Sequence, residues 1–248
     1  MKVSDMQFVA NAKSTNLLLS EMAAADVVAG RSLPPFFALY TDYQTQGRGM
    51  GRNRWFSSRG ANLLVSFYVR PPLPAARQFL FNQYFSIVTA AFLEQFVPEV
   101  RIKWPNDLYI NGKKVAGILI EHRVCGDRLP YTVAGIGINV NQTSFPSDIP
   151  NPTSLLLETG VRHDIAAILQ TYRQSLLDHF TGLSVENAEW LHTHYMRRLY
   201  RLNEFGRYRI HDKELNAAID DIDTYGRLVL EDENGGRHIC GFKEVTFL

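Results

Sequence analysis

Residues 44–55 read Gln44-Thr45-Gln46-Gly47-Arg48-Gly49-Met50-Gly51-Arg52-Asn53-Arg54-Trp55, and the rest of the chain is organised around them. Three glycines within five positions add no side chain to a core, and each costs conformational entropy to order. Glycine lets a backbone approach a ligand and present its N–H groups to an anion. The arginines suit phosphate or carboxylate oxygens, and Trp55 offers a stacking surface. This pattern predicts a loop that closes over an anionic, nucleotide-derived ligand; the alternative is an exposed basic hairpin turn.

Length and composition limit the class of protein. The 248 residues suffice for one large domain, or for a large and a small one. A net charge of +1 gives no basic field that would recruit nucleic acid. The two cysteines, Cys125 and Cys240, have no metal-ligand spacing and form no disulfide framework. Polar residues interrupt every long apolar run, so we expect neither a membrane span nor a signal peptide. We therefore expect a cytoplasmic protein.

Hydrophobic periodicity predicts both strands and helices. Strands are expected at 7–10, 36–40, 62–69 and 131–141, and helices at about 14–25, 75–96, 164–180 and 186–200, with a short one that ends at Gly160. Asn111-Gly112 between two apolar runs predicts a hairpin. After Arg201, short strand-like segments separated by turn residues indicate a small β-barrel of about 45 residues.

The first predicted helix begins at Ser14-Thr15-Asn16. Ser14 or Thr15 is an expected N-cap. The alternative is that these groups hydrogen-bond a ligand, since the free N–H groups of a helix N-terminus can donate to one.

Two later motifs are further candidates for a site. Lys103 and Asp107 bracket Pro105, where the strand breaks, so we expect their side chains to converge; a solvated hairpin with charged tips is the other interpretation. Gly135 and Gly137 alternate with isoleucines, which indicates a backbone close to a ligand or to another strand. A bulged core strand is the alternative there.

These motifs, in this order, resemble the biotin protein ligase family. The resemblance rests on Ser14-Thr15-Asn16, on the glycine loop Gln44–Trp55, on Lys103-Trp104-Pro105-Asn106-Asp107 with Lys114–Glu121, and on Gly135–Asn141. It implies an α+β fold: a mixed, mostly antiparallel sheet with flanking helices, like the class II synthetase-like ligase domain, over residues 1–202. A C-terminal SH3-like barrel is implied over residues 203–248. No DNA-binding unit precedes residue 1, so the ligase-only class is expected.

The family implies a two-step reaction. Biotin and MgATP give biotinyl-5′-AMP and pyrophosphate, and a lysine of a carboxyl-carrier domain then takes the biotin as an amide. The cofactors implied are therefore ATP and Mg²⁺, with no metal site on the protein. The partner implied is the carrier domain, not nucleic acid or a membrane, and the chain is expected to be a monomer or a homodimer.

The resemblance also assigns roles to residues of this chain. The catalytic group comprises Lys114, Arg48 and Asp107. The biotin-binding group comprises Ser14, Thr15, Asn16, Gln44, Gly47, Arg48, Gly49, Met50, Lys114, Gly117, Gly135 and Ile138. The nucleotide-binding group comprises Arg52, Trp55, Lys103, Asn106 and Asn139.

One position departs from the pattern. Many relatives carry a second arginine two residues after the first, where this chain has Met50, and that arginine helps to retain the adenylate. Our hypothesis is that Met50 leaves the closed loop less tightly held, or that Arg52 substitutes. Two other functions stay open: a lipoate or octanoate ligase or transferase of the same fold, and a non-catalytic module that binds biotin or a carrier.

Overall fold

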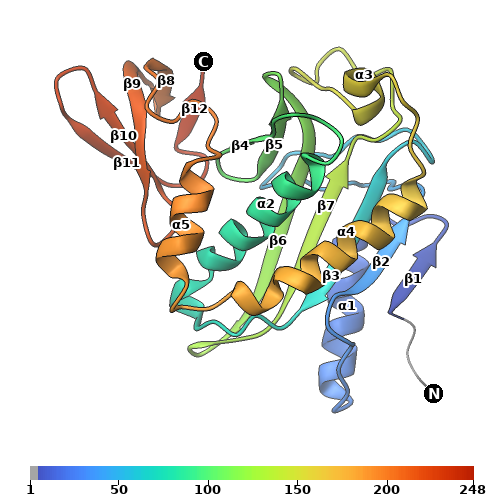
Figure 1. Cartoon of the computed structure of the whole chain (residues 1–248). Helices are drawn as coiled ribbons and strands as arrows, with labels where there is room; N and C mark the ends of the chain where they lie inside the picture. The colour runs from blue at the N-terminus through green and yellow to red at the C-terminus, as the bar shows by residue number, and fades with distance from the viewer. Residues whose placement is uncertain (1–4) are drawn as a thin grey trace.

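The computed structural model describes residues 5–248, which form two β-sheets with helices packed on the larger one (Figure 1). The large sheet runs in the order β1-β2-β3-β7-β6-β5-β4. Its strands are β1 (Met6–Val9), β2 (Phe37–Thr41), β3 (Leu63–Val69), β4 (Arg101–Lys103), β5 (Asp107–Ile110), β6 (Lys113–Cys125) and β7 (Arg128–Ile138). β1 is parallel to β2 and every other neighbouring pair is antiparallel, which confirms the predicted mixed sheet.

Helices cover both faces of this sheet (Figure 1). On one face lie α2 (Phe79–Leu93) and α4 (Ile165–His179), with α5 (Ala188–Met196) packed against α2. α2 is buried almost all round, as expected of a helix that is apolar on every side. On the other face lies α1 (Thr15–Val28), whose Leu19 and Ala23 pack against β2, β3 and β7. The face that α1 only partly covers is the one that carries the candidate site.

The predicted helix boundaries hold with small changes. The helix expected at 75–96 is a 3₁₀ turn, η1 (Ala75–Arg77), followed by α2. The short helix α3 (Leu155–Thr159) starts at Ser154, whose side chain accepts a hydrogen bond from Leu157 N, and ends at Gly160 with φ of +72°. A second 3₁₀ turn, η2 (Phe180–Gly182), follows α4.

The small C-terminal sheet is antiparallel, in the order β11-β10-β9-β8-β12. Its strands are β8 (Gly206–Ile210), β9 (Lys213–Ile222), β10 (Leu228–Asp232), β11 (Arg237–Cys240) and β12 (Val245–Phe247). The predicted C-terminal β unit is thus confirmed, with β12 as an additional short strand. It docks beside β4 and β5 (Figure 1), where Trp104 Nε1 donates to Gly226 O at 2.9 Å and the indole stacks on Phe242.

Candidate active site

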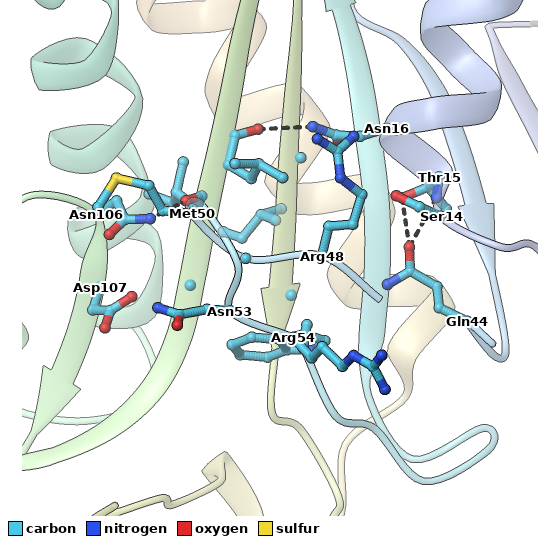
Figure 2. A pocket seen from close by; sticks show the side chains of 18 of the residues that line it. Ser14, Thr15, Asn16, Gln44, Arg48, Met50, Asn53, Arg54, Asn106 and Asp107 are labelled. Atoms are coloured by element: carbon cyan, nitrogen blue, oxygen red, sulfur yellow. Dashed lines mark hydrogen bonds between the residues drawn. The ribbon is translucent and has the colours of Figure 1, made fainter. Parts of the chain in front are cut away.

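A pocket of about 200 Å³ lies on the α1 face of the large sheet (Figure 2). It is enclosed by the start of α1, the glycine loop, the β4–β5 turn, the first half of β6 and the end of β7. Residues from five separated segments therefore meet here. The predicted site residues in its lining are Ser14, Thr15, Asn16, Gln44, Arg48, Gly49, Met50, Trp55, Asn106, Asp107, Lys114, Gly117 and Gly135.

The glycine loop is folded as a short hairpin over this pocket. Trp55 N donates to Gly47 O at 2.9 Å, and Gly49 N donates to Asn53 O at 2.8 Å. The turn at its tip contains Gly51 with φ of +70°, a conformation that favours glycine. The basic hairpin turn is thus confirmed, and that this hairpin closes over a ligand stays a prediction.

Trp55 lies flat on two glycines of neighbouring strands. Gly117 of β6 and Gly137 of β7 are paired across the sheet. A Cβ at Gly137 would lie 2.3 Å from Trp55 Cε2, and one at Gly117 would lie 2.8 Å from Trp55 Cζ3. Both glycines are therefore needed for the indole to approach the sheet. Lys114 Nζ lies 5.5 Å from the centroid of the same ring, so a cation borders this surface.

At the end of the pocket formed by the β5–β6 hairpin, Lys114 pairs with Asp107. Lys114 Nζ lies 2.7 Å from Asp107 Oδ1, and each side chain is about one quarter exposed (27% and 23%). The backbone of Lys114 is fixed on both sides, because its N–H donates to Asn151 O and its carbonyl accepts from Thr153 N. The Asn106 amide is likewise held, donating to Ile118 O. A cation held in this way can neutralise oxygens of an anionic ligand.

At the α1 end, side chains and backbone form a hydrogen-bond network. Gln44 Oε1 accepts from Thr15 N at 2.8 Å and from Thr15 Oγ1 at 3.3 Å (Figure 2). Ser66 Oγ donates to Asn16 Oδ1 at 2.5 Å and lies 2.7 Å from Thr15 Oγ1. The predicted N-cap position is confirmed at Ser14, although the Ser14 side chain makes no capping hydrogen bond. One free helix donor, Thr15 N, is met instead by Gln44 at the start of the glycine loop, and Ser14 lines the pocket.

Asn16 and Arg48 share one carboxylate. Asn16 Nδ2 donates to Leu119 O at 3.0 Å and to Glu121 Oε2 at 2.9 Å. Arg48 Nη2 donates to Glu121 Oε1 at 2.8 Å, and Nη1 to Oε2 at 3.4 Å. Figure 2 shows the Arg48 side chain extending toward Asn16, on the opposite side of the pocket from Asp107. Arg48 and Lys114, expected together at one reacting centre, are thus held by different carboxylates.

Five predicted residues lie outside the pocket lining. Ile138 is fully buried on the other face of β7, among the side chains of the main core. Lys103 pairs in register with Asp107, but its ammonium lies 3.2 Å from Tyr109 Oη and over the ring of Phe247, away from the pocket. Burial lowers the pKa of Lys103 below its ordinary value.

The remaining three lie at the edges of the site. Arg52 is exposed at the tip of the glycine loop. Gly47 is buried beneath it, where a Cβ would lie 2.4 Å from Trp55 O. Asn139 is buried beyond Gly137; its Nδ2 donates to Thr153 O, and its Oδ1 has no hydrogen-bond partner.

The resemblance assigned no role to several lining or network residues. They are Asn53, Arg54, Ser66, Pro105, Ile118, Leu119, Glu121, Ile136 and Gly137. Gly137 had a usable signal, because residues two apart on a strand share a face and Gly135 was already assigned. Ser66 and Glu121 had none, since their partners are distant in sequence. Among residues 5–248, no group of three or more His, Cys, Asp or Glu side chains is placed to hold a metal ion.

The described helices include none that is long and apolar enough to cross a bilayer.

Solved biotin protein ligases have a similar fold. Biotin protein ligase from Aquifex aeolicus, solved with biotin and ATP, superposes with a TM-score of 0.79 at 22% identity, over 99% of each chain. The model of the biotin/lipoate A/B protein ligase family matches residues 33–139. The biotin–[acetyl-CoA-carboxylase] ligase of Paracoccus denitrificans is 31% identical over 218 residues, covering 82% of this chain and 87% of that protein. This chain belongs to the biotin/lipoate protein ligase family.

Other relatives are longer. The bifunctional ligase/repressor BirA of Bacillus subtilis is 34% identical over 163 residues, which cover 62% of this chain and 49% of that protein. The chain thus spans about half the length of that relative.

Proposed function

We propose that this chain is a biotin–protein ligase. It would join biotin to MgATP, releasing pyrophosphate and forming biotinyl-5′-AMP, and then transfer the biotinyl group to a lysine of a carrier domain, releasing AMP. The observation that carries the proposal is the Lys114–Asp107 pair, 2.7 Å long, in a pocket whose other end is a network of amides and hydroxyls. The name of the Paracoccus relative and the ligands of the Aquifex structure support the choice of acid and nucleotide.

The first step needs positive charge. A carboxylate must attack an α-phosphate although both are anions, so cations and N–H donors at the reacting atoms lower the barrier. Lys114 supplies an ammonium whose backbone is fixed within a strand and whose partner Asp107 limits its motion. The glycine loop would close over the acyl-adenylate and exclude water, which would otherwise hydrolyse it.

Nucleotide binding is supported by two polar atoms without partners. Trp55 Nε1, a donor, and Asn139 Oδ1, an acceptor, are both buried with no hydrogen-bond partner. A buried polar atom is costly unless a partner meets it. An adenine offers both an amino donor and ring-nitrogen acceptors, as well as a flat surface to stack on the Trp55 indole. We therefore assign the part of the pocket near Trp55 to the nucleotide. The end formed by Thr15, Asn16 and Gln44 is assigned to the biotin ureido ring.

Mg²⁺ would enter as part of its ATP complex. Magnesium in nucleotide sites is held by one or two carboxylates together with the substrate phosphates. The pocket lining offers one carboxylate, Asp107, which already pairs with Lys114. The phosphates would therefore supply most of the ligands. In the second step Asp107 would also orient the incoming lysine.

We further propose that residues 1–202 bind both substrates and that residues 203–248 support the β4–β5 turn. The carrier domain is the proposed protein partner.

The deciding experiment is ATP–pyrophosphate exchange, run in parallel with biotin, lipoate and octanoate. Exchange with biotin alone is the expected result. Exchange with lipoate or octanoate would assign the chain to the sister activity of the family. No exchange with any of the three acids, under conditions where biotin still binds, would identify a non-catalytic binding module.

A further inference from the structure

Glu121 joins three parts of the site that are distant in sequence. Its carboxylate accepts two hydrogen bonds from Arg48 of the glycine loop and one from Asn16 at the start of α1. Glu121 itself lies on β6, the strand that begins with Lys113 and Lys114. One side chain on the rigid sheet therefore fixes both the loop and the helix terminus at the proposed acid end of the pocket.

The surroundings of Glu121 favour a role in geometry over a role in stability. Its side chain is 34% exposed and that of Arg48 is 45% exposed. Ion pairs this open to water contribute about 0–1 kcal/mol to folding. The two-pronged contact between guanidinium and carboxylate nevertheless fixes orientation, because both groups are planar. Asn16, by contrast, is 3% exposed, so its amide cannot turn to solvent when its partner is lost.

The network makes this contact one end of a chain of hydrogen bonds. From Glu121 the contacts pass through Asn16, Ser66 and Thr15 to Gln44. Gln44 begins the glycine loop, and Arg48 follows it four residues later. The entry of the loop is thus tied at two points to the first turn of α1, and Glu121 holds the second of them.

We propose that Glu121 is a positioning residue of the proposed ligase. Its carboxylate holds the Arg48 guanidinium and the Asn16 amide in one arrangement, so that the glycine loop lies closed over the acid before the acid reacts. The proposal rests on the proposed function for the identity of the acid. Its holding role concerns this chain alone and needs no substrate to be tested.

The test uses the full chain with Glu121→Gln, which keeps the size and removes the charge, and Glu121→Asp, which keeps the charge and shortens the side chain. Glu214→Gln is the matched control, because Glu214 also binds two arginines, Arg207 and Arg209, but lies on the small sheet. Two quantities are measured. The first is the rate of tryptic cleavage after Arg48 without ligand, followed by mass spectrometry. The second is kcat and KM for biotin in pyrophosphate exchange.

We expect Glu121→Gln to raise the rate of cleavage after Arg48 severalfold, because trypsin must take the Arg48 side chain that Glu121 now holds. The KM for biotin should rise about tenfold while kcat changes little, the pattern of lost binding with chemistry unaltered. Glu121→Asp should fall between Glu121→Gln and the wild type, and Glu214→Gln should match the wild type.

Wild-type cleavage and wild-type KM in Glu121→Gln would overturn the proposal while leaving the ligase function intact. If the wild type exchanges no acid, the proposed function fails on its own. The cleavage rate then decides the holding role: a faster rate in Glu121→Gln supports it, and an unchanged rate refutes it.

Discussion

The two ends of the pocket each carry one ion pair of almost the same length, but the pairs are supported differently. Lys114 and Asp107, 2.7 Å apart, both stand on β-strands of one hydrogen-bonded hairpin. Arg48 and Glu121, 2.8 Å apart, join a glycine loop to a strand. The first pair is about one quarter exposed, whereas the second is 45% and 34% exposed.

This difference suggests separate tasks for the two cations. Charges act more strongly where water is scarce and where their positions are fixed before the reaction. Lys114 meets both conditions, which suits a group that stabilises developing charge. Arg48 is on a loop outside the sheet and is more exposed than Lys114, which suits a group that binds the ligand and retains it. The chemistry would therefore depend on the Lys114–Asp107 pair, at what we call the strand end of the pocket. The residence time of the ligand would depend on the Arg48–Glu121 pair, at the loop end.

The largest expected effect is at the strand end. Lys114→Ala should lower kcat for biotin-dependent pyrophosphate exchange by about 1000-fold, the loss typical of removing a charge-stabilising group. Arg48→Ala should act mainly on KM. Lys113→Ala is the matched control, since Lys113 adjoins Lys114 but faces Glu158 at 3.7 Å. Equal losses of kcat in Lys114→Ala and Arg48→Ala would contradict the separation of tasks.

Two glycines of β7 allow the two ends of the pocket to be tested separately, because each lies against a different side chain. A Cβ at Gly135 would lie 2.0 Å from Asn16 Oδ1, and one at Gly137 would lie 2.3 Å from Trp55 Cε2. Gly135→Ala should therefore raise KM for biotin by about tenfold or more, and Gly137→Ala should raise KM for ATP by a similar factor, since either methyl displaces a packed group.

Steady-state kinetics with each substrate varied in turn would test this pair. Gly182→Ala is the control, because its new methyl would meet nothing within 4 Å. A result in which both β7 variants raise the same KM would refute the assignment of biotin to one end and the nucleotide to the other.

Local patterns predicted most helices and strands and the β5–β6 hairpin well, whereas the fold class was implied by the family resemblance. Asn111-Gly112 set the β5–β6 hairpin, with φ of +50° and +73° at its two turn residues, and this hairpin brings Asp107 to Lys114. The glycines of β7 do mark a close approach to the strand, but the groups that approach are the side chains of Asn16 and Trp55. Ile138 was misplaced because it stands three residues from Gly135, and an odd separation on a strand puts two residues on opposite faces.

The loop end could not be predicted in the same way. The contacts of Glu121 with Arg48 and Asn16 span 73 and 105 residues, and that of Ser66 with Asn16 spans 50. No local periodicity encodes such pairings, which depend on the order of strands in the sheet. The contact of Gln44 with the start of α1 is of the same kind, since Gln44 reaches the N-terminus of the helix from a distant segment.

A smaller effect is expected at Met50, where the loop contributes an apolar side chain to the pocket lining. Met50→Arg should slow release of biotinyl-5′-AMP about fivefold, the effect of roughly one added hydrogen bond with a net contribution of about 1 kcal/mol. Arg52 does not line the pocket and is exposed at the tip of the loop, so Arg52→Met should leave release unchanged. Release is followed by filtration of the pre-formed adenylate complex. Faster release from Arg52→Met would mean instead that Arg52 substitutes for the missing arginine.

The smallest effects are expected at the turn between β11 and β12, which contacts both ends. Phe242 stacks on Trp104 at 5.4 Å between ring centroids, beside the β4–β5 turn. The Lys243 side chain lies against the loop tip, since a Cβ at Gly51 would be 2.3 Å from Lys243 Cε. Phe242→Ala should reduce the free energy of unfolding by about 1 kcal/mol through lost aromatic packing. Lys243→Ala should leave that free energy within about 0.5 kcal/mol of the wild type, because it removes only an exposed flexible side chain.

Urea unfolding compares the two variants directly, and tryptic cleavage after Arg52 reports on the loop tip. Lys243→Ala should speed that cleavage, because the tip loses its neighbour, whereas Phe242→Ala should affect it less. The opposite pattern, with Lys243→Ala the more destabilising and Phe242→Ala the more susceptible to cleavage, would mean that the small sheet supports the loop through Phe242. The strand end would then owe its rigidity to the β5–β6 hairpin alone.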